Sequence, residues 1–334
     1  MPVAYVVPLQ RAWARAKSML FRPFNLELWF VLGFTAWLAR LWDNAGMGGG
    51  NWGRNGVRID GDEAGRIFRD DYGWEVERFN WFGLGGLEAG LIVLLVLIGL
   101  ALAVALAWLS SRGEFMFLDN VVHRRAEVTR PWREFGRLAD TLFLWRVGVQ
   151  IVCGALALAL VLPALFTIIP IVEGGAWRGF GILVALLLAL IGFLLGIASA
   201  LVNFWTDQFV VPVMYRRRVS VLDGWRLFVP LLRVRLAPMV LFALFYLALA
   251  IGVGLAVLAA GLVTCCVGWL VLAIPYIGTV IMLPIYVTGR ALGPEFLTQF
   301  GDEYRLWDED ETDGNGTPPE LTDGGGEDEG DQGP

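Results

Sequence analysis

The stretch LIVLLVLIGLALAVALAWL, residues 91–109, contains no charged side chain. About 20 apolar residues in a helix are long enough to cross the hydrocarbon core of a bilayer, which is about 30 Å thick. A strand of a membrane barrel would alternate apolar and polar residues, and this run does not alternate. Because lipid offers no hydrogen-bond partners to the backbone, the run predicts a transmembrane helix.

The rest of the chain has the same character. Hydrophobic residues make up 57% of its 334 residues, charged residues make up 17%, and the mean hydropathy is +0.61. Soluble proteins carry about 25% charged residues. We expect membrane spans at residues 26–42, 84–109, 142–172, 180–205, 236–262 and 265–287. The predicted fold class is therefore all-α, a polytopic integral membrane protein with about six transmembrane helices.

The number of basic residues alternates from one connecting segment to the next. Four precede the first span, six lie between the second and third, six lie between the fourth and fifth, and two follow the sixth. The three remaining connections hold five, one and none. Connections rich in Arg and Lys stay in the cytoplasm during insertion. We therefore predict a multi-pass protein of the cytoplasmic membrane with both termini in the cytoplasm.

Two of the basic segments match each other without a gap. They are VVHRRAEVTRPWREF, residues 121–135, and MYRRRVSVLDGWRLF, residues 214–228. The N-terminal RAWARAKSMLFRPF, residues 11–24, is interpreted as a third and more diverged copy, because it is also basic and also precedes a span. We predict three units, each an amphipathic interfacial helix followed by a helical hairpin, at approximately residues 8–110, 111–206 and 207–289.

The repeated segments have an apolar side and a basic side. In the second copy Val221, Trp225 and Phe228 recur at intervals of three and four residues, which is typical of one helix face. A basic face beside a face with Trp and Phe favours a helix that lies in the headgroup layer, where each basic residue contributes ~1 kcal/mol near anionic lipid. The residues expected to bind lipid headgroups are Arg124, Arg125, Arg133, Arg216, Arg217, Arg218 and Arg226, and the expected interfacial anchors are Trp13, Trp132 and Trp225. The predicted partners are therefore membrane phospholipids and not nucleic acid, since lipid phosphate is the nearer ligand.

Two regions differ from the repeated units. Residues 43–83 are rich in glycine and are predicted to form an extracytoplasmic loop. Residues 1–300 form the predicted transmembrane domain, and residues 301–334 form a predicted disordered cytoplasmic tail, because acidic side chains repel one another and few apolar residues are available for a core. A solubilising role is favoured for the tail, and an unknown basic protein partner is the alternative.

Polar side chains near the spans are the candidates for chemistry. Arg146 and Asp207 are both expected near the cytoplasmic face, where they either pair with each other or reach the headgroups. Asp119 and His123 are four residues apart, which favours a surface hydrogen bond over a shared proton or metal ion. The sequence contains no catalytic or cofactor-binding motif and no spacing typical of a metal site, so we predict no cofactor and no metal.

Two stretches carry a resemblance to known proteins. AWARAKSMLFRPFNLELWFVLGF, residues 12–34, and FMFLDNVVHRRA, residues 115–126, resemble uncharacterised prokaryotic families of multi-pass membrane proteins. Those families are distantly similar to the membrane domain that accompanies some glycerophosphodiester phosphodiesterases. The resemblance implies the architecture alone, because this chain has no soluble catalytic domain and its single His123 does not supply the metal site of such an enzyme.

Three functional hypotheses follow from the sequence. The first is a scaffold or accessory factor of the cytoplasmic membrane that has no catalytic site and whose interfacial helices bind anionic lipid. The second is a transporter or channel for a small solute, since internal repeats are common in such folds. The third is a membrane-embedded lipid-modifying enzyme, for which Asp119 and His123 are the best available residues.

Overall fold

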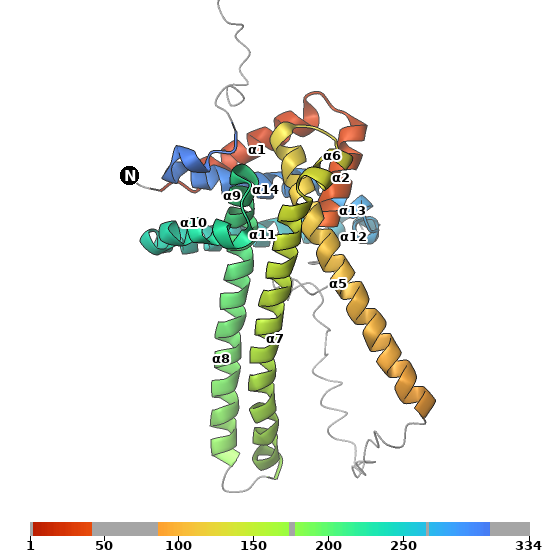
Figure 1. Ribbon diagram of the computed structural model, residues 1–334, viewed down its shortest axis with the longest axis vertical. Coiled ribbons are helices and arrows are strands. Elements are labelled where there is room, and N and C mark those ends of the chain that lie inside the picture. The colour runs from red at the N-terminus through yellow and green to blue at the C-terminus, as the bar shows by residue number, and fades with distance from the viewer. Residues whose placement is uncertain (1–2, 42–85, 174–177, 265–266, 308–334) are drawn as a thin grey trace, which may run out of the picture.

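The computed structural model describes residues 3–41, 86–173, 178–264 and 267–307, and every regular element in these ranges is a helix (Figure 1). Within these ranges, the helices long and apolar enough to cross a membrane are Gly90–His123, Gly136–Ala164, Gly179–Arg217 and Leu236–Val263. The protein is therefore all-helical and has the features of a membrane protein.

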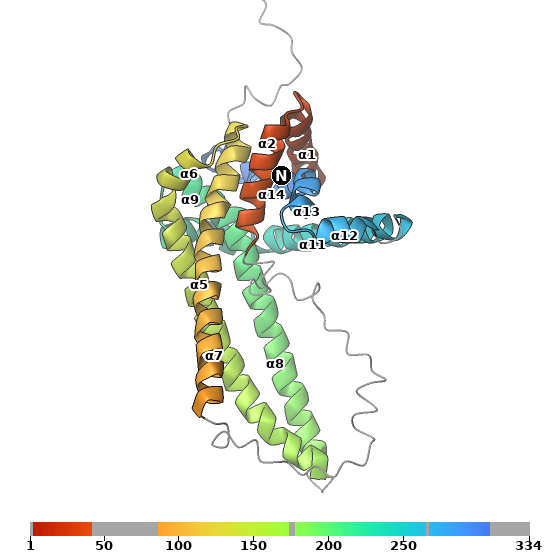
Figure 2. The same ribbon diagram turned by 90° about the vertical axis from the view of Figure 1, so that its right-hand side faces the viewer.

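Long helices project from a compact head. Helices α7 (Gly136–Glu173) and α8 (Arg178–Trp205) run side by side away from the head, and α5 (Gly86–His123) diverges from them (Figure 1). Helix α11 (Leu236–Val263) and the short α12 (Val267–Ala273) leave the head crosswise to α7 and α8 (Figure 2). The expected bundle of six parallel spans is thus not the arrangement of the described residues.

The projecting helices expose apolar side chains along their length. Leu95 on α5 and Phe193 on α8 are both 66% exposed, and many of their neighbours are exposed to a similar degree. Soluble monomers rarely leave contiguous apolar surface of this extent in water. A lipid environment removes this surface from water, which is consistent with helices that cross a membrane.

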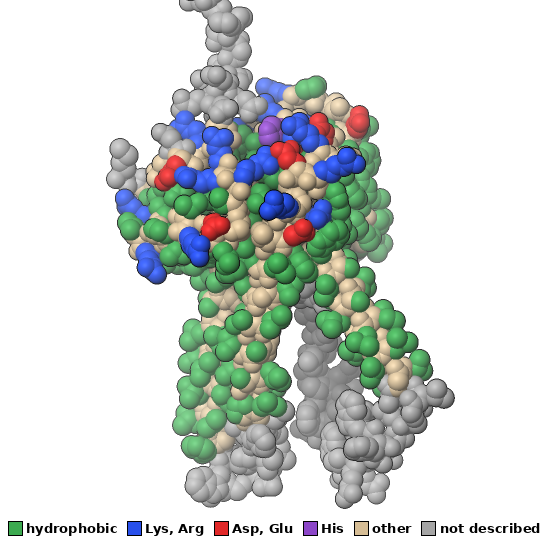
Figure 3. All heavy atoms as spheres, in the orientation of Figure 1, with side chains coloured by type: hydrophobic (Ala, Val, Ile, Leu, Met, Phe, Trp, Pro, Cys, Tyr) green, Lys and Arg blue, Asp and Glu red, His purple; other side chains and the backbone are tan. Residues whose placement is uncertain are grey.

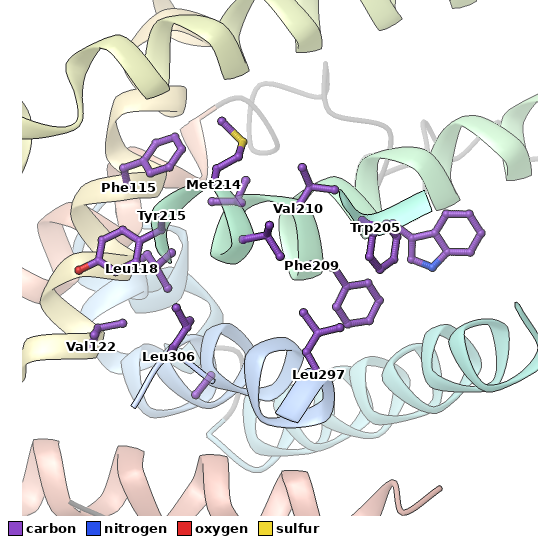
Figure 4. Packing of buried hydrophobic residues seen from close by; sticks show 14 of the residues in the cluster. Phe115, Leu118, Val122, Trp205, Phe209, Val210, Met214, Tyr215, Leu297 and Leu306 are labelled. Atoms are coloured by element: carbon purple, nitrogen blue, oxygen red, sulfur yellow. The ribbon is translucent and has the colours of Figure 1, made fainter. Parts of the chain in front are cut away.

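The head combines short helices with the inner ends of the long ones. Its short helices are α1 (Val6–Phe21), α2 (Leu26–Ala39), α6 (Thr129–Glu134), α9 (Val211–Arg217), α10 (Val221–Val234), α13 (Ile277–Ile281) and α14 (Leu283–Leu297). Phe209, Phe242 and Phe296 are fully buried in its core, and the ring centroids of Phe242 and Phe296 lie 4.2 Å apart. Side chains from α5, α9 and α14 converge on the same interior (Figure 4). The core of the protein therefore lies in the head and not between the projecting helices.

A π-helical turn, η1 (Thr206–Val210), connects α8 to α9 where this long helix enters the head. A π turn carries extra backbone relative to an α-helical turn and often occurs at functional sites. Here it turns Thr206, Gln208 and Phe209 into the interior. The chain thus changes from a lipid-exposed helix to a buried one without a loop.

The expected first and sixth spans differ most from the structure. Helix α2 has 14 residues, which corresponds to about 21 Å, and its Ala39 carbonyl accepts a hydrogen bond from Ser110 near the head end of α5. The expected sixth span is divided among α12, α13 and α14. Pro275 lies in the first break, followed by Tyr276 with a φ of 71°, and Pro284 stands in the first turn of α14. Since proline cannot donate a backbone hydrogen bond, it ends or starts a helix at these positions.

Two of the predicted unit boundaries fall within helical segments. The boundary after residue 110 falls within α5, and the boundary after residue 206 falls within the π turn. Both long helices continue into the head and end at His123 and Arg217, each followed by an Arg with positive φ. Hydrophobicity locates the apolar part of a helix and not the whole helix, so each of these predicted boundaries lies before the end of its helical segment.

The head extends into the predicted tail. Leu306 and Trp307 are buried against it, and the guanidinium of Arg15 lies 4.3 Å from the Trp307 ring centroid. The packed head therefore extends beyond residue 300, to the last described residue. Residues 308–334 of the predicted tail and the whole predicted loop 43–83 lie outside the described residues.

Replacing Gly113 with Ala tests the contact between α2 and α5. A Cβ at Gly113 would lie 2.5 Å from the backbone nitrogen of Ala39, whereas a Cβ at Gly99 on the same helix would have no neighbour within 4 Å. We expect Gly113→Ala to lower the free energy of unfolding by about 1–3 kcal/mol, because two backbones are forced apart. Gly99→Ala is the matched control and should leave it nearly unchanged. Thermal unfolding in detergent, followed by circular dichroism, measures both, and equal melting temperatures would contradict this packing.

Candidate functional site

Basic side chains gather over the head, while the long helices below it carry apolar side chains (Figure 3). All seven Arg residues predicted to bind headgroups belong to this head surface. Those exposed are Arg124, Arg133, Arg216, Arg217, Arg218 and Arg226, and Arg125 is half-buried. The structure therefore brings the two clear copies of the basic segment to the same end of the long helices.

The two copies also contact each other. Arg218, which has a φ of 57°, places its guanidinium 4.2 Å from the ring centroid of Phe135 and donates a hydrogen bond of 2.6 Å to Glu134. The rings of Phe135 and Tyr215 stack at 4.8 Å. A left-handed conformation costs a non-glycine residue about 1–2 kcal/mol, and these contacts offset it. One continuous basic surface results, in place of two separate helices.

Four of the predicted headgroup residues form ion pairs within the protein. The pairs are Arg125–Asp119 at 2.7 Å, Arg217–Glu303 at 2.9 Å, Arg218–Glu134 at 2.6 Å and Arg226–Asp223 at 3.0 Å. Burial lowers the pKa of Arg125, but the hydrogen bond and the charge of Asp119 raise its pKa by more, so Arg125 stays charged. The hydrogen bond from Ser220, assisted by the charge of Arg226, lowers the pKa of Asp223. Exposed Arg133 and Arg216 therefore present their charge most directly to an outside ligand.

The three predicted tryptophan anchors lie in different surroundings. Trp13 is 49% exposed. Trp132 and Trp225 are half-buried, with ring centroids 5.8 Å from Trp108 and 5.7 Å from Trp145, respectively. In α10 the apolar stripe that carries Trp225 faces the core of the head, so this stripe is covered by protein and not by lipid.

Asp119 is the centre of a small polar cluster below the basic surface. Its side chain is 1% exposed, and its two carboxylate oxygens accept hydrogen bonds of 2.7 Å from the Tyr215 hydroxyl and from Arg125. The Nδ1 atom of His123 lies 3.2 Å from the same carboxylate. The expected contact between Asp119 and His123 is confirmed, although the carboxylate is buried and not at the surface. The described residues contain no group of three or more side chains suited to a metal ion.

A second polar cluster is buried where the long helices enter the head. Arg146 on α7 donates a 2.8 Å hydrogen bond to Asp207 in the π turn, which confirms the expected pair. Arg290 on α14 pairs with Glu114 on α5 and also donates to the Asp207 carbonyl at 3.0 Å. Two guanidinium groups and two carboxylates thus form a neutral cluster that joins four elements, since a buried charge needs a partner.

Helix α14 is fixed at two further points. Glu295 is 3% exposed and accepts a hydrogen bond of 2.5 Å from the Nε of Arg15 on α1. Gly293 lies so close to the π turn that a Cβ there would be 2.3 Å from the carbonyl oxygen of Gln208. The chain is buried without interruption from Arg290 to Leu297, so α14 is the central element of the head.

Sequence reasoning missed the residues of α14. From the sequence, residues 289–300 are interpreted as a remnant of a fourth unit, which assigns no partners to Arg290 and Glu295. The signal was the presence of Arg290 and Glu295 in a segment that is otherwise mostly apolar, a pattern that requires partners for both charges. From the sequence, Arg112 counts only as one basic residue among others. In the structure its guanidinium lies over the rings of both Trp108 and Trp132.

Comparison with known proteins gives a family but no function. Residues 5–298 match the model described as "Family of unknown function (DUF7544)", so the chain belongs to this family. No curated protein and no solved structure matches the chain. The resemblance to uncharacterised membrane proteins is thus supported at the level of an uncharacterised family, and no match supports similarity to glycerophosphodiester phosphodiesterases.

Removal of Arg290 tests the buried cluster. We expect Arg290→Met to lower the free energy of unfolding by about 3–5 kcal/mol, because Glu114 is left buried without its closest partner. The double variant Glu114→Gln with Arg290→Met should recover part of this loss, since both charges are then absent. Thermal unfolding in detergent measures the two variants against Arg226→Met, whose side chain is 79% exposed and which should change stability little. A double variant no more stable than the single one would contradict the pairing.

Proposed function

We propose that this DUF7544 member is an integral protein of the cytoplasmic membrane that acts as a scaffold or accessory factor and binds anionic phospholipid headgroups. The observation that carries the proposal is the division of the surface into a basic head and apolar projecting helices (Figure 3). With the projecting helices in lipid, the basic surface at their inner ends lies at the level of the headgroups. The residues proposed to contact phosphate are the seven Arg residues of the two contacting basic segments.

Arginine suits this role chemically. Its planar guanidinium offers two parallel donors to one phosphate and is weakly hydrated, so phosphate binding costs less desolvation than with lysine. Lys17 is the only lysine among the 26 basic residues of the chain. Near an anionic membrane surface, exposed Arg133 and Arg216 contribute together about 2 kcal/mol, which favours anionic over neutral lipid.

The number of crossings and the orientation are further parts of the proposal. The alternation of basic residues along the sequence supports six crossings in three units with both termini in the cytoplasm. Four of these crossings correspond to the described helices that are long and apolar enough to span a membrane.

The transport hypothesis has less support. Buried charges in a transporter are expected to line a pathway near the centre of the membrane. Glu114, Arg146, Asp207 and Arg290 lie instead at the inner ends of the helices, and they pair with one another. Their arrangement is that of a structural cluster.

Substitution of exposed Arg residues tests lipid binding. We expect Arg133→Gln and Arg216→Gln together to weaken the binding of phosphatidylglycerol by about 30-fold, because about 2 kcal/mol of attraction is removed. The matched control replaces the same residues with Lys and keeps the charge. Native mass spectrometry after titration with phosphatidylglycerol or phosphatidylcholine measures the effect. Equal retention of the two lipids by the unmodified protein would refute the proposal.

Labelling of single cysteines tests the orientation. In a chain whose three natural cysteines are replaced by Ala, we expect Val263→Cys to react with a membrane-impermeant maleimide on intact cells. Val263 is 85% exposed at the outer end of α11. Arg226→Cys on the head should react only after the cells are permeabilised. Reaction of both positions under the same condition would show that α11 does not cross the membrane.

A further inference from the structure

Helices α5 and α7 diverge below the head (Figure 1). A shallow, open apolar groove lies along α5 and reaches α7 at Phe143. Its volume is about 670 Å³, and it is lined by Leu97, Leu100, Ala101, Val104, Ala105 and Trp108 of α5 and by Phe143 of α7. Ala101 and Ala105 form its shallow floor, since they are one turn apart and have the smallest side chains of the set. The groove lies on the part of the protein that is proposed to be surrounded by lipid.

Polar groups close the groove at the head. The Nε1 atom of Trp108 donates a 3.0 Å hydrogen bond to Asp140, and Arg112 donates to the same carboxylate at 3.2 Å. The Arg112 guanidinium also lies 4.5 Å and 5.0 Å from the ring centroids of Trp108 and Trp132. Tryptophan and arginine with their polar ends outward are typical of the boundary between hydrocarbon and headgroups.

The rim carries an excess of positive charge. Arg112 is balanced by Asp140, and the nearby Glu134 is engaged by Arg218 and Arg130. Arg137 is exposed one helical turn before Asp140 on α7. Its charge is complementary to a phosphate at the head end of the groove.

The length of the groove indicates its occupant. From Trp108 to Leu97 the α5 axis advances about 16 Å, which is close to half the thickness of the hydrocarbon core. A single acyl chain of the leaflet next to the head has this extent. A helix from a second copy would instead follow α5 beyond Leu97 through the other leaflet.

We propose that the groove holds one acyl chain of an anionic phospholipid whose phosphate lies against Arg137. This inference rests on the proposed lipid-binding function and assigns it one specific site. The groove favours a lipid over a soluble phosphate compound, because an acyl chain buries apolar surface in the groove and a soluble phosphate compound does not. The lipid bridges α5 and α7 below the head, where their own contact ends.

Filling the groove tests the proposal. The variant Ala101→Phe with Ala105→Phe places two rings on its floor, and both alanines are exposed, so the core of the head is unchanged. The matched control is Ala157→Phe with Ala189→Phe, which adds the same rings at exposed positions of α7 and α8. Native mass spectrometry of the full-length, delipidated protein titrated with phosphatidylglycerol gives the affinity of the tightest site. We expect at least about tenfold weaker binding for the filled groove, because excluding two CH₂ groups has this effect, and no change for the control.

A second variant distinguishes the contribution of the lipid headgroup from that of the acyl chain. Arg137→Gln should weaken phosphatidylglycerol binding several-fold and phosphatidylcholine binding less, because choline balances the phosphate charge of phosphatidylcholine, whereas the filled groove should weaken both equally. Inorganic phosphate should compete poorly with the lipid. If the filled-groove variant binds phosphatidylglycerol with wild-type affinity and has an unchanged melting temperature, the groove is not the lipid site. The basic surface would then remain the proposed site. Loss of dimers in light scattering, with lipid affinity unchanged, would assign the groove to a second copy and equally overturn the proposal.

Discussion

The pairing of Arg290 with Glu114 is the interaction on which the arrangement of the head depends. It joins α14 to α5. Arg290 also donates a hydrogen bond to the Asp207 carbonyl, which joins α14 to the π turn between α8 and α9. A guanidinium buried in this position is tolerated only with partners on several sides, which fixes α14 relative to both long helices. The second pair of α14, between Glu295 and Arg15, attaches α1 by the same principle.

This constraint explains how the head is held together where helices from distant parts of the chain meet. The aromatic core around Phe242 and Phe296 supplies apolar burial, and the ion pairs select one register for α14 within it. The close approach at Gly293 is possible only in that register. Much of the apolar surface of α5, α7, α8 and α11 stays exposed in the described part of the chain and is available to lipid.

The sequence predicted helices better than it predicted their ends or their contacts. Continuous apolar runs locate the lipid-exposed parts of α5, α7, α8 and α11, since hydrophobicity and helix formation coincide there. The same reasoning stops at residues 110 and 206, because the inner ends of these helices are buried by protein and tolerate polar residues. The pair of Arg146 and Asp207 was predictable from two isolated charges near one face, whereas the partner of Arg290 was not, since a lone charge does not reveal which distant helix it meets. The amphipathic stripe of α10 was recognised, but its partner is protein, and amphipathicity does not distinguish protein from lipid.

The continuity of the long helices links the two environments of the protein. Helix α5 has 38 residues and therefore extends about 57 Å, of which about 30 Å is sufficient for the hydrocarbon core. The remainder lies in the head and carries Arg112, Glu114 and Asp119, the residues that contact α7, α14 and α9. A rotation of α5 in lipid would therefore move all three contacts at once. For this reason a lipid bound between α5 and α7 and a ligand bound to the basic surface would both act on the same helix.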